Sequence, residues 1–276
     1  MITELKKLEL YKCKNMLYDQ GQLEGRAVIE GVNPGRVFVD DIHSPTTGLI
    51  WLGNNDGFIF FGDENNEAFN NELNAFIDQI ITPEALKVGL HWFEGVGNHP
   101  SWNKTIERLL NNRDLGSWNQ RVYTLQKEDY TYKQELIIAK GYKVVKISKQ
   151  LYENKEHAIK NIDFLHNKIL AFWSSSEAFF NRGLGYCILY KNEIVSVCLS
   201  GFVAGNVHCI DIETLEAHQG KKLAQKIAQS FVEDCLTNNM VPYWDCMESN
   251  KPSITVAENI GFTSAFNYTG YEFPFK

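Results

Sequence analysis

The sequence predicts an α+β fold, with a mixed antiparallel and parallel sheet and flanking helices in the C-terminal half and a smaller α+β domain before it. The order of elements in the second half supports this, because antiparallel strands come first and a strand–helix–strand crossover follows. The length supports it too, because 276 residues exceed the usual size of one domain. We place the boundary between residues 130 and 131, within a polar and aromatic stretch without a clean period.

The first half, residues 1–130, alternates helical and extended patterns. Leu and Lys at helical spacing predict an amphipathic helix over residues 1–20. Short apolar runs predict strands at 35–41, 47–52 and 57–62, the last two joined by a turn at 53–56. An apolar stripe predicts a helix over 65–81, followed by a strand at 92–93 and a helix at 101–111. No chemical motif stands out in this half, which we expect to be a partner domain, with a degenerate relative of the second half as an open alternative.

The second half, residues 131–276, begins with a predicted strand at 142–147 and a helix at 155–172. A short helix at 177–181 precedes a hairpin of 186–190 and 194–203. The remaining predictions are strands at 207–214 and 243–246, helices at 221–237 and 252–259, and a final aromatic strand over 263–275. Together they predict a sheet that ends in a crossover.

Composition excludes several classes of function. A net charge of -7 and a pI near 5.6 argue against a general nucleic-acid binder. Lysines interrupt every apolar run in residues 1–18, and no stretch is long enough to span a bilayer, so we expect a cytoplasmic protein without a membrane partner. The six cysteines form no CxxC pair, so we expect free thiols and no metal.

A strand–turn–helix junction at residues 210–224 has the features of an anion site. The predicted strand ends near Thr214, a polar turn with Gly220 follows, and a long helix begins directly after it. The unpaired N–H groups and positive dipole of a helix start attract phosphate, and Lys221 and Lys222 add charge there. The alternative is an ordinary structural connection, since such junctions are common.

A second junction follows at residues 243–262, again as strand, polar turn and helix. Asn250 and Ser253 can cap this helix, which is their structural interpretation. If this strand lies parallel to the strand at 207–214, the two separate at their carboxyl ends. Two helix N-termini would then border one crevice.

Together the two junctions resemble the acyl-CoA motif of the GNAT superfamily and, within it, the zwittermicin A resistance type of acetyltransferase. The matching positions are Ile210, Ile212, Thr214, Gly220, Lys221, Leu223, Ala224, Trp244, Asp245, Asn250 and Ser253. The chain departs from the family pattern at Ala217, where Gln or Arg is usual, and at Lys222, where Gly or Ala is usual. Lys222 either contacts phosphate or crowds the diphosphate.

The resemblance implies acetyl-CoA as the cofactor, with pantetheine along the strand at 207–214 and the diphosphate on the following turn. The residues implied in this binding are Ile212, Thr214, Gln219, Gly220, Lys221, Lys222, Leu223, Ala224, Asn250 and Ser253. A backbone N–H in the range 212–215 would polarise the thioester carbonyl. The Tyr acid of many family members is replaced by Ala257, which leaves Tyr268, Tyr271 or departure of the thiolate without an acid as alternatives.

A general base is needed because an amine attacks only in its neutral form. Glu213 and Asp211 share one face of the strand, and His208 lies on the other. We expect Glu213 to be the base, with Asp211 second, against the alternative that both are solvated strand-end residues. Cys209 and Cys246 are expected to be buried structural thiols rather than nucleophiles.

Trp173 and Phe179 lie where the resemblance places the acceptor pocket, although core packing is the competing interpretation. The predicted function is transfer of an acetyl group to a primary amine of a small molecule, such as an aminopolyol antibiotic, by a monomer or homodimer. A non-catalytic acyl-CoA binding or sensing protein and a protein or peptide N-acetyltransferase are the alternatives.

Overall fold

The computed structural model describes residues 1–55, 57–131, 136–155 and 158–276. Residue 56 of the predicted turn and residues 156–157 of the predicted helix lie outside this part. The chain forms two compact units, one of Met1–Gln120 with Asn267–Lys276 and one of Arg121–Phe266. The division therefore lies ten residues before the boundary expected from sequence, and the C-terminal segment belongs to the first unit.

The first unit contains a five-stranded run of short strands and the helices between them. Its elements are β1 (Thr3–Glu4), the 3-10 helix η1 (Lys7–Met16), α1 (Leu23–Ile29), β2 (Gly35–Val39), β3 (Thr47–Leu52), β4 (Phe58–Gly62), α2 (Glu67–Phe76), the π-helix η2 (Ile77–Ile81), α3 (Thr82–Lys87), β5 (Trp92–Gly97) and α4 (Trp102–Leu109). Two long strands, β6 (Gly116–Thr124) and β12 (Thr263–Pro274), each run from one unit into the other.

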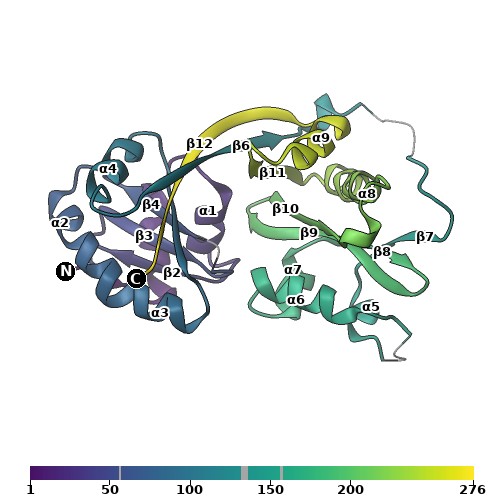
Figure 1. Ribbon diagram of the computed structural model, residues 1–276, viewed down its shortest axis with the longest axis horizontal. Helices are drawn as coiled ribbons and strands as arrows, with labels where there is room; N and C mark the ends of the chain where they lie inside the picture. The colour runs from purple at the N-terminus through teal and green to yellow at the C-terminus, as the bar shows by residue number, and fades with distance from the viewer. Residues whose placement is uncertain (56, 132–135, 156–157) are drawn as a thin grey trace. The chain divides into compact units, whose positions relative to one another are not determined.

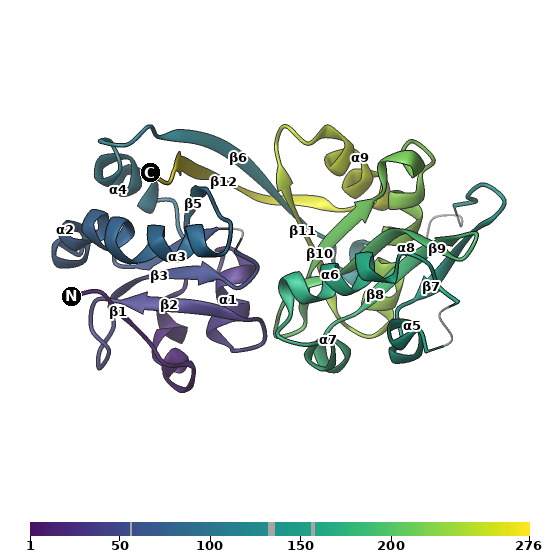
Figure 2. The same cartoon turned by 60° about the horizontal axis from the view of Figure 1, so that its bottom comes forward.

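The sheet of the first unit has the order β1-β2-β3-β4-β5-β12. Strands β1 to β4 pair antiparallel, and β4 pairs parallel with β5. Alternation along β3 separates two apolar layers, because Leu49 packs with residues of α2 to α4 whereas Ile50 contacts Gly25 of α1. The view in Figure 2 shows α2 and α3 lying along one face of this sheet.

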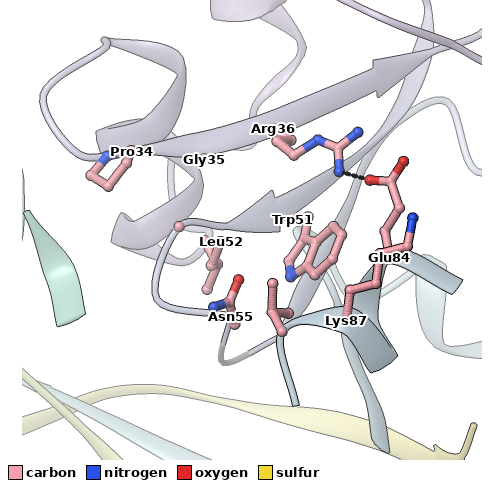
Figure 3. A pocket seen from close by; sticks show the side chains of 10 residues that line it. Pro34, Gly35, Arg36, Trp51, Leu52, Asn55, Glu84 and Lys87 are labelled. Atoms are coloured by element: carbon pink, nitrogen blue, oxygen red, sulfur yellow. Dashed lines mark hydrogen bonds and ion pairs between the residues drawn. The ribbon is translucent and has the colours of Figure 1, made fainter. Parts of the chain in front are cut away.

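One arginine ties several elements of the first unit together. The Arg36 guanidinium of β2 donates to Glu4 at 2.8 and 2.6 Å and also to Glu84 of α3. It lies 4.9 Å from the Phe38 ring centroid and 5.4 Å from that of Trp51. Figure 3 shows the Arg36–Glu84 ion pair beside a pocket at the end of β3, whose volume is about 510 Å³. The pairing holds α3 against the strand edges.

The second unit contains η3 (Lys127–Asp129), β7 (Tyr142–Lys146), α5 (Lys149–Glu153), α6 (Ile162–Phe172), α7 (Ser176–Arg182), β8 (Gly185–Tyr190), β9 (Glu193–Ala204), β10 (Val207–Thr214), η4 (Glu216–His218), α8 (Leu223–Thr237), β11 (Val241–Met247) and α9 (Lys251–Ile260). Strands β7 to β10 pair antiparallel, and β10 pairs parallel with β11. Figure 1 shows α8 and α6 on opposite faces of this sheet. The mixed α+β fold predicted from sequence is confirmed.

The two units repeat one topology, namely an antiparallel run of four strands, a helical crossover and a parallel fifth strand. They also exchange their last strands. The strand beside β5 is the late β12, whereas the strand beside β11 is the early β6. Because of this exchange, residues 1–120 alone lack a strand of their own sheet. We infer that the C-terminal segment is part of the first unit's core.

Phe273 provides a test of that inference. Its ring is 1% exposed and stacks on Phe93 of β5, with centroids 4.8 Å apart. Replacing Phe273 with Ala should lower the free energy of unfolding by about 3–5 kcal/mol, because it leaves a cavity in an aromatic stack. Hydrogen exchange should show lost protection in β3 to β5. The control, Phe266→Ala on the same strand but in the second unit, should leave those peptides protected; equal loss in both variants would contradict the inference.

Candidate functional site

The two parallel strands of the second unit separate towards their carboxyl ends. Strand β10 pairs with β11 only from Val207–Val241 to Cys209–Tyr243, although β10 continues to Thr214 and β11 to Met247. On its other side β10 stays paired with β9 up to Thr214. The last five residues of β10, 210–214, therefore have no β11 partner among the described residues, as the separation predicted from sequence requires.

A β-bulge lies at the point where the strands separate. Cys209 pairs with Phe202 and Ile210 pairs with Ser200, so Gly201 is an extra residue in β9. A bulge bends its strand and increases the local twist. The position suits glycine, because a Cβ on Gly201 would lie 3.3 Å from the Phe172 ring of α6. The bulge thus bends β9 at the point where β10 stops pairing with β11.

The main-chain groups of β10 alternate between β9 and the open side. Leu215 donates its N–H to the Val195 carbonyl at 2.9 Å, so the ladder turns the backbone of Glu213 towards β9 as well. The same alternation turns the backbone of Ile212 and Thr214 towards the open side. The Thr214 carbonyl there accepts a hydrogen bond from the Gln219 side chain at 3.0 Å.

The turn before α8 adopts left-handed conformations at two residues. Gly220 has φ of +71° and Lys222 has φ of +59°, the latter directly before the first residue of α8. No acidic residue occupies the first turn of α8, where Leu223 and Ala224 carry N–H groups without intrahelical partners. Lys221 donates to the Ala217 carbonyl at 2.7 Å. Lys222 is exposed and has no described partner, so it supplies an available cation at this helix start.

At the second junction, Asn250 and Ser253 make structural hydrogen bonds. The Asn250 side chain accepts from the Ser253 N–H at 3.1 Å and so caps α9. The Ser253 hydroxyl accepts from the Trp244 indole at 3.0 Å, which links α9 to β11. The capping interpretation is confirmed for Asn250, whereas the Ser253 side chain does not cap the helix but binds Trp244. A contact of either residue with a cofactor stays a prediction.

Asp211 and Glu213 do share a face of β10, and a third residue joins them there. Lys168 of α6 places its Nζ 3.2 Å from Asp211 Oδ2 and 2.7 Å from Glu213 Oε2. Burial raises the pKa of Asp211 above its ordinary value, although the Lys168 ammonium opposes this. Burial acts to lower the pKa of Lys168, but the two carboxylates more than offset it and the pKa is raised. Sequence reasoning missed Lys168.

His208 is an inert buried residue in this structure. Its side chain is 4% exposed, and its Nδ1 lies 2.9 Å from the Ser200 hydroxyl. Burial, together with the nearby charge of Arg182, lowers the pKa of His208 to about 4. The ring is therefore neutral at physiological pH. Cys209 and Cys246 are buried free thiols, and burial raises the pKa of Cys246, which disfavours a nucleophilic thiolate.

The predicted acceptor residues Trp173 and Phe179 pack in the interior. Trp173 is 2% exposed and donates its indole N–H to the Ser200 carbonyl at 2.8 Å. Phe179 is 1% exposed and meets the Trp173 ring edge-on. Tyr271, one alternative for the missing acid, belongs to the first unit, where its hydroxyl donates to Glu107 at 2.8 Å. Burial and this hydrogen bond raise the pKa of Tyr271.

The corresponding place in the first unit is closed. Pairing of β4 with β5 runs to Gly97, and the next residue, Asn98, donates its N–H to the Phe60 carbonyl at 2.8 Å. The His99 ring then lies 3.0 Å from the Gly62 carbonyl. Asp63 and Glu64 make the following turn acidic. Among the described residues, the second unit alone thus combines separated strands with a cationic helix start.

Neither a metal centre nor a membrane span emerges from the described ranges. Within them, no three His, Cys, Asp or Glu side chains are grouped so as to hold a metal ion. None of the helices found there combines the length and apolar character needed to cross a bilayer.

Comparison with known proteins agrees with this geometry. A family model described as GNAT acetyltransferase matches residues 14–271. The Bacillus subtilis protein named "Uncharacterized N-acetyltransferase YdfB" is 26% identical over 246 residues, which cover 89% of this chain and 88% of the relative.

Two solved structures share the fold over nearly the whole chain. A GCN5-related N-acetyltransferase-like protein from Streptococcus suis has a TM-score of 0.66 at 22% identity, covering 96% of this chain and 98% of that one. A tandem GNAT protein from the clavulanic acid biosynthesis pathway has a TM-score of 0.62 at 8% identity, covering 100% and 99%. The match to a tandem protein parallels the repeated topology found here.

The left-handed backbone conformation of Lys222 leads to a prediction about stability. A non-glycine residue at positive φ is strained by roughly 1–2 kcal/mol, partly offset by the greater unfolded-state entropy of glycine. Lys222→Gly should therefore raise the free energy of unfolding by about 0.5–1 kcal/mol in urea titrations. Lys221→Gly is the matched control and should destabilise, because it loses the hydrogen bond to Ala217. Equal effects of both variants would contradict the assignment.

His208 makes a pH prediction. Because the pKa is about 4 when folded and 6.5 in a free side chain, the unfolded chain binds a proton first as the pH falls. The stability due to neutral His208 is complete above pH 6.5 and is lost towards pH 4, by up to about 3 kcal/mol. His208→Asn should flatten this loss in unfolding curves at several pH values. The control is the exposed His91→Asn, and an unchanged acid response in His208→Asn would refute the prediction.

Proposed function

This chain belongs to the GNAT acetyltransferase family, and from this premise we propose that it transfers an acetyl group from acetyl-CoA to a primary amine of a small molecule, by direct attack in a ternary complex. The observation that carries the proposal is the open side of β10. Backbone groups of Ile212 and Thr214 face it, and the cationic start of α8 lies at its end.

The residues present fit an acyl-CoA. A diphosphate suits the turn 219–224, because free N–H groups at Leu223 and Ala224 and the unpaired Lys222 ammonium offer donors and positive charge. The pantetheine amides suit the backbone at Ile212 and Thr214. For the Thr214 carbonyl to serve, the Gln219 side chain must give up its hydrogen bond. Asn250 and Ser253 would border the same gap from the start of α9.

Acetyl-CoA supplies an activated thioester, and the chain supplies main-chain donors and a base. The N–H of Ile212 or Thr214, fixed by the β9 ladder, would polarise the thioester carbonyl. The attacking amine would then form the amide bond as the C–S bond breaks and coenzyme A leaves as the thiolate. Glu213, the more exposed of the two carboxylates, would accept the proton from the amine, with Asp211 as second choice. The raised pKa of Asp211 increases its basicity and supports its participation.

The most specific part of the proposal is the chemical class of the acceptor amine. The resemblance to the zwittermicin A resistance type favours an aminopolyol antibiotic, and it rests on Trp244, Asp245, Asn250 and Ser253 together with the first junction. Trp173 and Phe179 would shape the acceptor side from behind, given their burial. We further propose a cytoplasmic monomer or homodimer, in keeping with its six buried free cysteines.

Acetyl-CoA turnover with a panel of amines tests the activity, with an aminopolyol, a diamine and a lysine peptide as acceptors. Glu213→Gln should lower kcat/KM by about 10²–10⁴-fold, because it removes the general base. Asp211→Asn is the matched variant and should have the smaller effect. Turnover by Glu213→Gln at the wild-type rate from about pH 6 to about pH 9 would exclude Glu213 as the base.

The chain should bind one acyl-CoA, since the corresponding gap in the first unit is closed by Asn98 and His99. Calorimetric titration with acetyl-CoA should give a stoichiometry near one. Lys222→Gln should weaken the affinity by about tenfold, as expected for loss of one charge-assisted phosphate contact. The control Lys87→Gln in the first unit should leave it unchanged, and a stoichiometry of two would refute the single site.

A further inference from the structure

We propose that Lys168 is a positioning residue for the acetyl transfer, which holds the Glu213 and Asp211 carboxylates in one orientation through an ion pair to each. This inference rests on the proposed function, in which a carboxylate of β10 receives the amine proton. It adds a residue from α6, outside both acyl-CoA junctions, to the machinery of the reaction.

The geometry places one ammonium between two carboxylates. Lys168 Nζ lies 2.7 Å from Glu213 and 3.2 Å from Asp211, which are two residues apart on one strand. The Lys168 and Asp211 side chains are each 22% exposed, and that of Glu213 is 47% exposed. The lysine and the inner carboxylate are thus largely shielded, while the outer carboxylate remains open to a substrate.

The backbone of α6 is held in place beside these strands, so the lysine is delivered from a fixed position. Ile169, next to Lys168, is fully buried. The Phe172 ring packs edge-on against Phe202 of β9, with centroids 5.5 Å apart. Directly after the helix, the Trp173 indole donates to the Ser200 carbonyl. These contacts anchor α6 at the bulge in β9.

The charges explain why a lysine is needed there. Two carboxylates on one face of a strand repel each other, which favours the protonated form of one of them. A protonated Glu213 could not accept a proton from the amine. The Lys168 ammonium offsets this repulsion and the burial of Asp211. The Cys198 thiol of β9 contributes no charge, because burial raises its pKa well above the ordinary value. Removing Lys168 should therefore raise the pKa of Asp211 further and move the acidic limb of the activity to higher pH.

The pH dependence of kcat/KM for acetyl-CoA turnover tests this. The acidic limb reports the base in its free state. In Lys168→Met it should move to higher pH by about 1–3 units, the usual effect of one nearby charge. Lys168→Arg should restore it, because arginine keeps the charge and can bridge both carboxylates. The exposed lysine variant Lys143→Met is the control and should keep the wild-type limb.

A double variant keeps the inference testable if Lys168→Met does not fold. If Lys168→Met unfolds, the double variant Lys168→Met with Asp211→Asn is measured instead. It removes the repulsion between the carboxylates but leaves Glu213 without its cation. Its acidic limb should therefore still lie at higher pH than that of Asp211→Asn alone. An acidic limb at the wild-type pH in Lys168→Met, or at the Asp211→Asn pH in the double variant, overturns the inference. Failure of the proposed function is separate, because wild-type protein would then show no acetyl-CoA turnover.

Discussion

The second unit depends on one constraint, which is that β10 and β11 stop pairing after three residue pairs. Two parallel strands that continue beyond their last hydrogen bonds leave main-chain donors and acceptors exposed, and such groups need other partners. Here the Gly201 bulge bends β9, to which the end of β10 stays paired, and the hydrogen bond from Trp244 to Ser253 holds α9 against β11. The separation thus coincides with contacts on both strands, and the backbone of Ile212 and the N–H of Thr214 are left available for a ligand.

The first unit shows the same topology without the opening. Its β5 ends in Gly97, and Asn98 continues the pairing with β4, so β5 stays paired with β4 to its own end. The buried Asn98 side chain also accepts the Tyr18 N–H at 2.6 Å, which fastens the segment after η1 to the same place. One repeat thus uses the strand ends for internal hydrogen bonds, and the other leaves them open where the acyl-CoA is proposed to bind. This difference in strand pairing, rather than the fold, distinguishes the two units.

The sequence predicted the local features well and the long-range ones poorly. The turn at Gly220 and the cap at Asn250 were predictable because adjacent residues determine turn and cap chemistry. Lys222 was expected within the helix at 221–237, but it lies directly before α8 in a left-handed conformation. Lys168 could not be found, because its partners are more than forty residues away and nothing near it distinguishes it from a solvated helix lysine. The exchange of β6 and β12 was hidden for the same reason, since an alternating aromatic strand fits the edge of either sheet.

At Lys222, backbone strain is accompanied by an added positive charge. The family pattern has Gly or Ala there, and the observed φ of +59° is one that glycine adopts without strain. Because lysine at this φ keeps the same backbone path, the N–H groups of the first turn of α8 keep their direction. The strain of roughly 1–2 kcal/mol comes with a cation beside the helix start, where an anion is already favoured. Since the side chain is exposed, it adds charge at this helix start without filling the turn. Lysine at this position thus adds backbone strain but also a positive charge that would favour a bound phosphate.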